Sequence, residues 1–200
     1  MKVTSTGILH GVISDEYGKR GTQFNAHGMP TYSLPISIQD APAGTVSYAI
    51  VLEDKDAYPV SGGFVWIHWT VANLTRTELE ENESISATDF VQGANSWMSV
   101  QGGQQSRKES SYYGGMCPPD TTHLYELHVF ALDTKLQLDN GFYLNELYRQ
   151  IDLCDGFILQ GGLYSANYEI EMAKKIIELD KPLIGICAGF NNILRAIGTD

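Results

Sequence analysis

Three short runs of β-branched and aromatic residues constrain the fold of this chain more than any other feature. They are residues 45–53 (Thr-Val-Ser-Tyr-Ala-Ile-Val-Leu-Glu), 64–74 and 124–132. Runs of this length and composition are typical of β-strands, and the Gly- and Pro-rich clusters at 40–44 and 114–119 are typical of turns between them. Few helical periods occur before residue 140. The sequence therefore predicts a mainly β unit, an antiparallel β-sandwich.

The pattern changes after residue 150, which we take as a domain boundary. Residues 154–159 form an apolar run that leads into glycines, and residues 168–179 carry an apolar stripe at helical spacing. A second apolar run at 183–187 and the start of another helix follow. This β-α-β-α order is typical of a parallel sheet. We thus expect two domains, residues 1–150 and residues 151–200, the second being an incomplete α/β fragment.

Charge and composition exclude several classes of partner. The formal net charge is -11 and the 13 Lys and Arg residues are scattered, so the chain lacks the basic stripe that nucleic-acid binding needs. An apolar run of the roughly 18 residues that span a membrane is absent, as is a signal peptide, which predicts a cytoplasmic protein without integral membrane contact. The three cysteines, Cys117, Cys154 and Cys187, are widely separated and favour reduced thiols over a disulfide framework or a zinc site.

Polar side chains of the kinds that bind ligands or catalyse reactions lie at the ends of the predicted strands. Asp54 and Asp56 follow the first run, and strict alternation places His68 opposite Ile67, Trp69 and Val71. In the third run, alternation gives His123 and Tyr125 one face and His128 the other. If the three segments converge, two carboxylates, two imidazoles and a phenol line one cavity that suits a small anion.

Each of these residues also has a purely structural interpretation. A single His on a strand is more often a hydrogen-bonded structural residue, and Asp in a turn after a strand is commonly a local acceptor. A metal site lacks support, because the spacing of Asp and His is not that of a ligand set. We expect neither a metal nor a cofactor.

Residues 1 to about 149 resemble the phosphatidylethanolamine-binding protein family, in particular its bacterial branch of Raf-kinase-inhibitor-like proteins. The motifs are Asp40-Ala41-Pro42-Ala43-Gly44-Thr45, Asp54-x-Asp56-Ala57-x-Pro59, Trp66-x-His68-Trp69-x-Val71-x-Asn73 and Pro118-Pro119-Asp120-x-x-His123-x-Tyr125-x-Leu127. The resemblance implies an antiparallel β-sandwich with a pocket for phosphate-like and other small anions. It assigns to that pocket Asp54, Asp56, His68, Gly115, Pro118, His123 and Tyr125.

The sequence departs from the family pattern in three places. Lys55 stands where Pro is usual between the two aspartates, and Met116-Cys117 interrupts the glycine–proline turn. The short closing segment that family members carry after the helix at 144–148 is not recognisable, so we expect part of the pocket wall to be missing.

Residues 185–189 (Gly-Ile-Cys-Ala-Gly) suit a strand-to-helix turn that exposes Cys187 as a nucleophile, with Gly161 and Gly162 as oxyanion donors. The alternative is that these small residues only permit close packing. Residues 151–200 resemble the N-terminal part of class I glutamine amidotransferase-like hydrolases, especially the γ-glutamyl hydrolase branch. That family takes its catalytic His and acid from beyond the cysteine, whereas all five His residues here precede residue 129.

The leading hypothesis is non-catalytic binding of a small anion or phospholipid head group by residues 1–150. The alternative is a cysteine hydrolase of γ-glutamyl amides, inactive because Cys187 lacks its partners. An interaction module that inhibits kinases or proteases has no support at the level of residues. Residues 151–200 are expected to dock on the sandwich, to pair with a second copy as a homo-oligomer, or to be poorly ordered. The abrupt join favours a fusion or a truncated reading frame.

Overall fold

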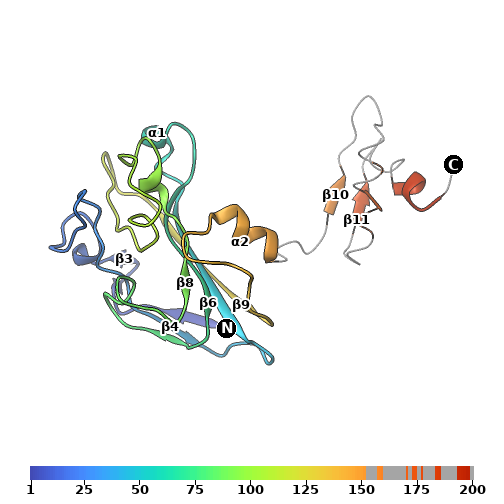
Figure 1. Ribbon diagram of the computed structural model, residues 1–200, viewed down its shortest axis with the longest axis horizontal. Coiled ribbons are helices and arrows are strands. Elements are labelled where there is room, and N and C mark those ends of the chain that lie inside the picture. The colour runs from blue at the N-terminus through green and yellow to red at the C-terminus, as the bar shows by residue number, and fades with distance from the viewer. Residues whose placement is uncertain are drawn as a thin grey trace. The chain divides into compact units, whose positions relative to one another are not determined.

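The computed structural model describes residues 1–151, 157–159, 170, 173–174, 177, 183–185 and 193–198. The chain forms two compact units, Met1–Ile151 and Asp152–Asp200. The first unit contains the strands, helices and turns from which the candidate pocket is built (Figure 1).

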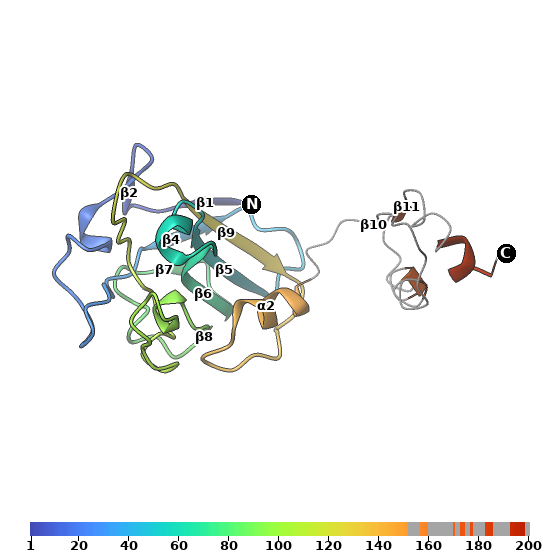
Figure 2. The same cartoon turned by 90° about the horizontal axis from the view of Figure 1, so that it is seen from above.

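The largest sheet of the first unit has four antiparallel strands in the order β8 (Val91–Gln92), β6 (Trp66–Leu74), β5 (Ser47–Asp54) and β9 (Tyr125–Leu132), which Figure 2 shows side by side. A second sheet contains β1 (Lys2–Thr4), β4 (Ile36–Gln39) and β7 (Glu78–Leu79), and β2 (Ile8–Leu9) pairs with β3 (Val12–Ile13). The helices are short: η1 (Asp15–Tyr17), α1 (Tyr58–Ser61), η2 (Ser96–Met98) and α2 (Leu144–Gln150). The three predicted strands correspond to β5, β6 and β9, which confirms the mainly β prediction.

Strand β5 lies at the centre of the core because all of its residues are buried. Its alternate residues Tyr48, Ile50 and Leu52 join a cluster with Trp69 and Val71 of β6 and with residues of β4 and β7. The residues in between, Ala49 and Val51, join a second cluster with the segment that contains α2. A strand covered on both faces reads as a continuous apolar run, which explains the composition of residues 45–53.

Strand β6 contains two irregularities in its pairing with β5. Leu52 pairs with Trp69 and Glu53 pairs with Ile67, so His68 is an extra residue with no partner in the register. A second irregularity lies around Asn73, which has a positive φ of 62° and whose side chain exchanges hydrogen bonds with the backbone of Leu136. Such bulges re-aim side chains that strict alternation would place elsewhere.

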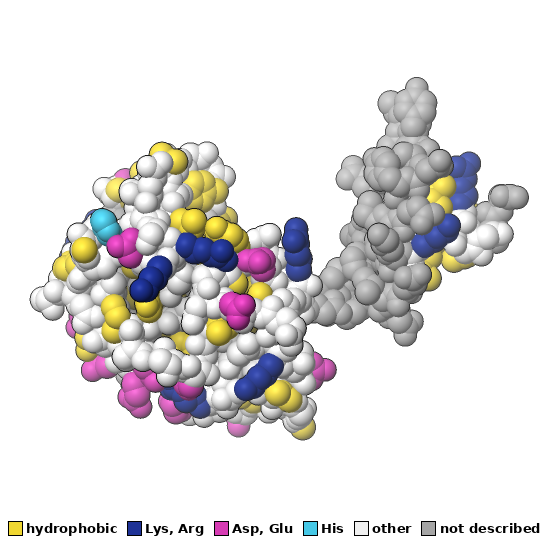
Figure 3. Space-filling model, viewed as in Figure 1, with side chains coloured by type: hydrophobic (Ala, Val, Ile, Leu, Met, Phe, Trp, Pro, Cys, Tyr) yellow, Lys and Arg dark blue, Asp and Glu magenta, His cyan; other side chains and the backbone are white. Residues whose placement is uncertain are grey.

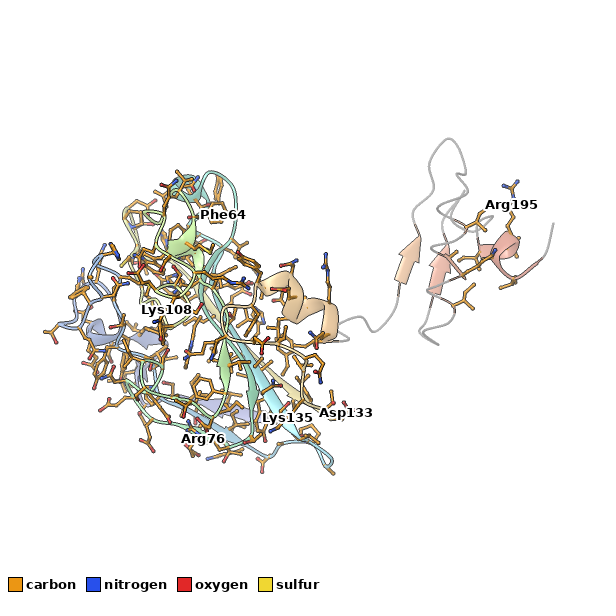
Figure 4. All side chains as sticks on the ribbon, in the orientation of Figure 1. Phe64, Arg76, Lys108, Asp133, Lys135 and Arg195 are labelled. Atoms are coloured by element: carbon orange, nitrogen blue, oxygen red, sulfur yellow. The ribbon has the colours of Figure 1, made fainter. Side chains whose placement is uncertain are left out.

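Antiparallel pairing brings the candidate residues to one end of the four-stranded sheet. Asp54, the last residue of β5, pairs with Trp66 at the start of β6 and with Tyr125 at the start of β9. Figure 4 shows Phe64, just before β6, at this end, while Arg76, after β6, and Asp133, after β9, lie at the opposite end. The three predicted segments therefore converge.

In the second unit, β10 (Phe157–Leu159) and β11 (Leu183–Gly185) pair in parallel. Parallel pairing is what the expected β-α-β-α order requires. Cys187, Gly161 and Gly162 lie outside the described residues, so the amidotransferase-like fragment stays a prediction. Within the part of the chain that the structure describes, every helix is too short or too polar to cross a lipid bilayer.

Replacement of Asn73 tests the second bulge. Asn73→Ala should lower the free energy of unfolding by about 2–4 kcal/mol, because Ala disfavours the positive φ and both hydrogen bonds to Leu136 are lost. Asn73→Gly keeps the backbone freedom and should cost about 1–2 kcal/mol. Urea unfolding of the full chain measures both. Equal losses for the two variants would show that the positive φ plays no part.

Candidate functional site

Four side chains from three distant segments meet at the end of the sheet, and we call Asp54, His68, His123 and Tyr125 the Asp54 cluster. Oδ2 of Asp54 lies 2.7 Å from Nδ1 of His123 and 4.0 Å from Nε2 of His68. The ring of Tyr125 contacts His68 edge-on, with 5.3 Å between centroids. The structure thus brings together the imidazoles, phenol and first carboxylate that the sequence placed in one cavity.

Asp54 holds the cluster together from the end of β5. Its side chain is buried, and Oδ1 accepts the backbone N–H groups of Asp56 at 2.9 Å and Ala57 at 3.1 Å. Burial alone would raise the pKa of Asp54, but the adjacent imidazoles of His68 and His123 outweigh it and lower the pKa below its usual value. Asp54 is therefore an ionised carboxylate in the interior.

His123 is held between two carboxylates. Nδ1 donates to Asp54, and Nε2 lies 2.7 Å from Oδ1 of Asp120, whose side chain is half exposed. Burial lowers the pKa of His123, but the hydrogen bonds to both carboxylates outweigh it and raise the pKa above its usual value. Because both ring nitrogens are engaged, His123 is best described as an imidazolium. The sequence prediction missed Asp120, although its position three residues before His123 was a usable signal.

His68 presents one nitrogen that has no partner. Nδ1 donates to the carbonyl oxygen of Gly114 at 2.7 Å, because a carbonyl can only accept. Nε2 and the hydroxyl of Tyr125 are buried, and neither makes a hydrogen bond within the described part of the chain. Burial, reinforced by Asp54, raises the pKa of Tyr125 far above its usual value, so this phenol stays protonated.

Strict alternation along β6 predicted the wrong face of the sheet for His68. It placed His68 on the face opposite Trp69, yet His68 contacts Tyr125, which packs against the same core cluster as Trp69. The physical reason is the bulge, which turns two consecutive side chains toward one face of the sheet.

The structure places Asp56, Gly115 and Pro118 around the cluster rather than in it. Asp56 is exposed, and its Oδ2 accepts the N–H of Leu124 at 2.8 Å, which fastens the turn after β5 to the start of β9. Gly115 donates its N–H to Pro30, and a Cβ at this position would clash with the carbonyl oxygen of Tyr17. The carbonyl oxygen of Pro118 accepts a hydrogen bond from Nζ of Lys19.

A hollow of about 620 Å³ lies beside the cluster. His123, Tyr125 and Pro118 line it together with residues of the N-terminal segment, including Lys19 and Arg20. Both cations are exposed, and Arg20 is 3.2 Å from Asp15. Sequence analysis missed these two residues because their approach to residues 116–125 depends on long-range packing. On the face that Figure 3 shows, Lys and Arg side chains are interspersed with Asp and Glu.

A second polar group lies on the other face of β9. Glu53, Glu126 and His128 place potential metal-ligand atoms within 4.8 Å of one another. Nζ of Lys55, the residue that departs from the family pattern, lies 2.6 Å from Glu126 and 3.6 Å from Glu53. The ammonium of Lys55 therefore already offsets part of the charge of these two carboxylates. As predicted from alternation, His128 does not meet His123.

Replacement of Asp120 tests the pairing of His123. A raised pKa in the folded state contributes stability that is complete below the unfolded pKa of about 6.5 and is lost as pH rises through the folded pKa. Asp120→Asn should therefore lower the pKa of His123, measured by NMR titration, and destabilise the chain more at pH 6 than at pH 9. Asp15→Asn, which removes another exposed carboxylate, is the control. An unchanged pKa of His123 in Asp120→Asn would contradict this assignment.

Two curated proteins are similar in sequence to most of this chain. The YxkA protein of Bacillus subtilis is 42% identical over 143 residues, which are 70% of this chain and 84% of that protein. A UPF0098 protein of Chlamydia muridarum is 31% identical over 173 residues, covering 84% of this chain and 99% of the relative.

Two crystal structures are similar in fold. The phosphatidylethanolamine-binding protein homologue CT736 of Chlamydia trachomatis matches with a TM-score of 0.60 and 28% identity, over 76% of this chain and 87% of that one. YbcL of Escherichia coli, described as a member of the mammalian PEBP family, matches with a TM-score of 0.56 and 28% identity, over 73% of this chain and 85% of that one.

The family model for phosphatidylethanolamine-binding proteins matches residues 4–169, which include the Asp54 cluster and extend past the expected boundary at residue 150. The amidotransferase-like character of residues 151–200 stays a prediction. The match covers most of the chain, and the relatives and the solved structures agree with it. The chain belongs to the phosphatidylethanolamine-binding protein family.

Proposed function

We propose that this chain binds a small anion or a phosphorylated head group at the Asp54 cluster without catalysing its conversion. The observation that carries the proposal is the pair of unpartnered polar atoms, Nε2 of His68 and the hydroxyl of Tyr125, on rings 5.3 Å apart. A buried polar atom without a hydrogen bond costs about 1–3 kcal/mol, so a ligand that bonds to both atoms recovers this free energy.

The hollow beside the cluster supports an anionic ligand. Lys19 and Arg20 lie in its lining, and His123 adds the charge of its imidazolium, although Asp15, also in the lining, is ion-paired with Arg20. The carboxylates of Asp54 and Asp120 partly offset these charges and keep His123 protonated. Membership of a family named for binding phosphatidylethanolamine agrees with this class of ligand.

The chemistry of the described side chains favours binding over catalysis. Burial raises the pKa of Cys117 to about 11, so its thiol is not a ready nucleophile near neutral pH. The phenol of Tyr125 stays protonated, and both nitrogens of His123 are engaged. None of these groups is poised to exchange a proton with a substrate.

We also infer that the two sheets of the first unit form the β-sandwich that the sequence predicted. Support comes from the first core cluster, which takes residues from β4 and β7 of one sheet and from β5 and β6 of the other. A cytoplasmic location and the pairing of residues 151–200 with a second copy stay predictions.

Calorimetric titration of the full chain with phosphate and with phosphoethanolamine tests the function. His68→Ala should weaken binding by about 10- to 100-fold, because it removes one of the two unpartnered polar atoms. His128→Ala removes an imidazole on the other face of β9 and should bind as the wild type does. Negligible heat from the wild type, or equal affinities of the wild type and His68→Ala, would reject the proposal.

A further inference from the structure

We propose that this chain binds a zinc ion at a second site, on the face of the four-stranded sheet opposite the Asp54 cluster. Its ligands are the side chains of Glu53, Glu126 and His128, which we call the Glu53 cluster. They lie on the face of β5 and β9 that carries Val51 of the second core cluster. The inference goes beyond the proposed function and does not depend on it, because the two clusters share no residue.

The pairing of β5 with β9 places two carboxylates directly opposite each other. Glu53 pairs with Glu126 in the register, and His128 pairs with Val51, two residues further along the same face. Like charges directly opposite on neighbouring strands destabilise a sheet. The side chain of Glu53 is only 12% exposed, so water screens its charge poorly. The register therefore favours a cation between these two side chains.

The atoms of the Glu53 cluster lie at the spacing of ligands around one small cation. Nε2 of His128 lies 3.5 Å from Oε1 of Glu53 and 3.4 Å from Oε2 of Glu126. In a tetrahedral zinc site with bonds of about 2.0–2.2 Å, neighbouring ligand atoms are about 3.3–3.6 Å apart. The two carboxylate oxygens lie within 4.8 Å of each other, and the partly exposed side chain of Glu126 leaves room to bring them closer. Three corners of a tetrahedron are therefore nearly formed.

Lys55 holds the place of a cation in this cluster. Its Nζ lies 2.6 Å from Oε2 of Glu126 and 3.6 Å from Oε1 of Glu53. These are the same two oxygens that face the imidazole of His128. One ammonium offsets only one of the two negative charges, whereas a dication offsets both. The side chain of Lys55 is 51% exposed and has a flexible stem, so it can turn into solvent when a metal ion binds. The ammonium and zinc thus compete for one position.

The kind of donor atoms selects zinc over calcium or magnesium. Ca²⁺ and Mg²⁺ take oxygen ligands, whereas an imidazole nitrogen combined with carboxylate oxygens suits zinc. The ring of His128 stacks on that of Phe130, with 6.4 Å between centroids, which helps to fix its orientation. The spacing of ligands along the chain predicted no metal site, because these side chains meet only through the pairing of β5 with β9.

Calorimetric titration of the full chain with zinc chloride tests the site. A phosphate-free buffer at about pH 8 keeps ligand histidines neutral, as zinc binding requires. The wild type should bind zinc saturably, and His128→Ala should weaken the binding by at least about tenfold, because a ligand is lost. His27→Ala is the matched control, since its imidazole faces the single carboxylate of Glu109 and not two. The affinity of this control should equal that of the wild type.

Lys55→Ala tests the competition between the ammonium and zinc. Removal of a positive charge beside both carboxylates should tighten zinc binding by about tenfold. Lys135→Ala removes a positive charge beyond the other end of β9 and should leave the affinity unchanged (Figure 4). Equal affinities of Lys55→Ala and the wild type would overturn the role of Lys55.

NMR spectra of the wild type identify the ligand without any substitution. Zinc should shift the ring signals of His128 and leave those of His123, in the Asp54 cluster, in place. A shift of His123 instead, zinc binding that His128→Ala does not weaken, or no saturable zinc binding by the wild type would each overturn the inference. The NMR result decides the question if His128→Ala does not fold. None of these outcomes bears on anion binding at the Asp54 cluster, which the titration with phosphate tests separately.

Discussion

The ion pair between Asp54 and His123 is the interaction on which the arrangement of the site depends. It joins the end of β5 to the segment just before β9, across 69 residues of sequence. A buried carboxylate is costly unless a counter-charge and hydrogen bonds compensate it, and Asp54 has both: the imidazolium on Oδ2 and two backbone N–H groups on Oδ1. The same contacts orient His123 and fix the turn at Asp54–Ala57. One side chain therefore orients the cluster and holds the turn that follows β5.

The bulges of β6 show how a strand inside a core can serve a site. Trp69 and Val71 pack against β5 in the first core cluster, so a regular strand would leave His68 on the other face. One extra residue in the register frees His68 to lie beside Asp54 and Tyr125 while its neighbours remain in the core. The backbone carbonyl of Gly114 then fixes the ring through Nδ1. The position of the imidazole is thus set by main-chain geometry as much as by its own contacts.

Local sequence patterns were enough to predict much of the fold, but they predicted a smaller part of the candidate site. The strand at residues 45–53 could be predicted because both faces of β5 are buried and its residues are mostly apolar. Alternation along β9 correctly placed His123 and His128 on different faces. The orientation of His68 was not predictable, because a bulge depends on the register between two strands and not on the residues of one. The family resemblance assigned Asp56 and Gly115 to the pocket, but in the structure their contacts fasten backbone segments together. Lys19 joins the site through packing between distant segments, which periodicity does not encode, whereas Asp120 contacts His123 from three residues away in sequence.

The N-terminal segment around Gly18 and Lys19 borders the site, although it is about 100 residues away in sequence from the residues that it contacts. Gly18 forms a bridge with Met116, and the N–H and Nζ of Lys19 reach the carbonyl oxygens of Met116 and Pro118. Contacts between such distant residues form slowly, because a long loop must close first. During synthesis on the ribosome, Asp54 and the first twenty residues must wait for residues 114–125 to emerge. The polypeptide thus completes this candidate site only after residue 125 has been translated, and the early strands wait without it until then.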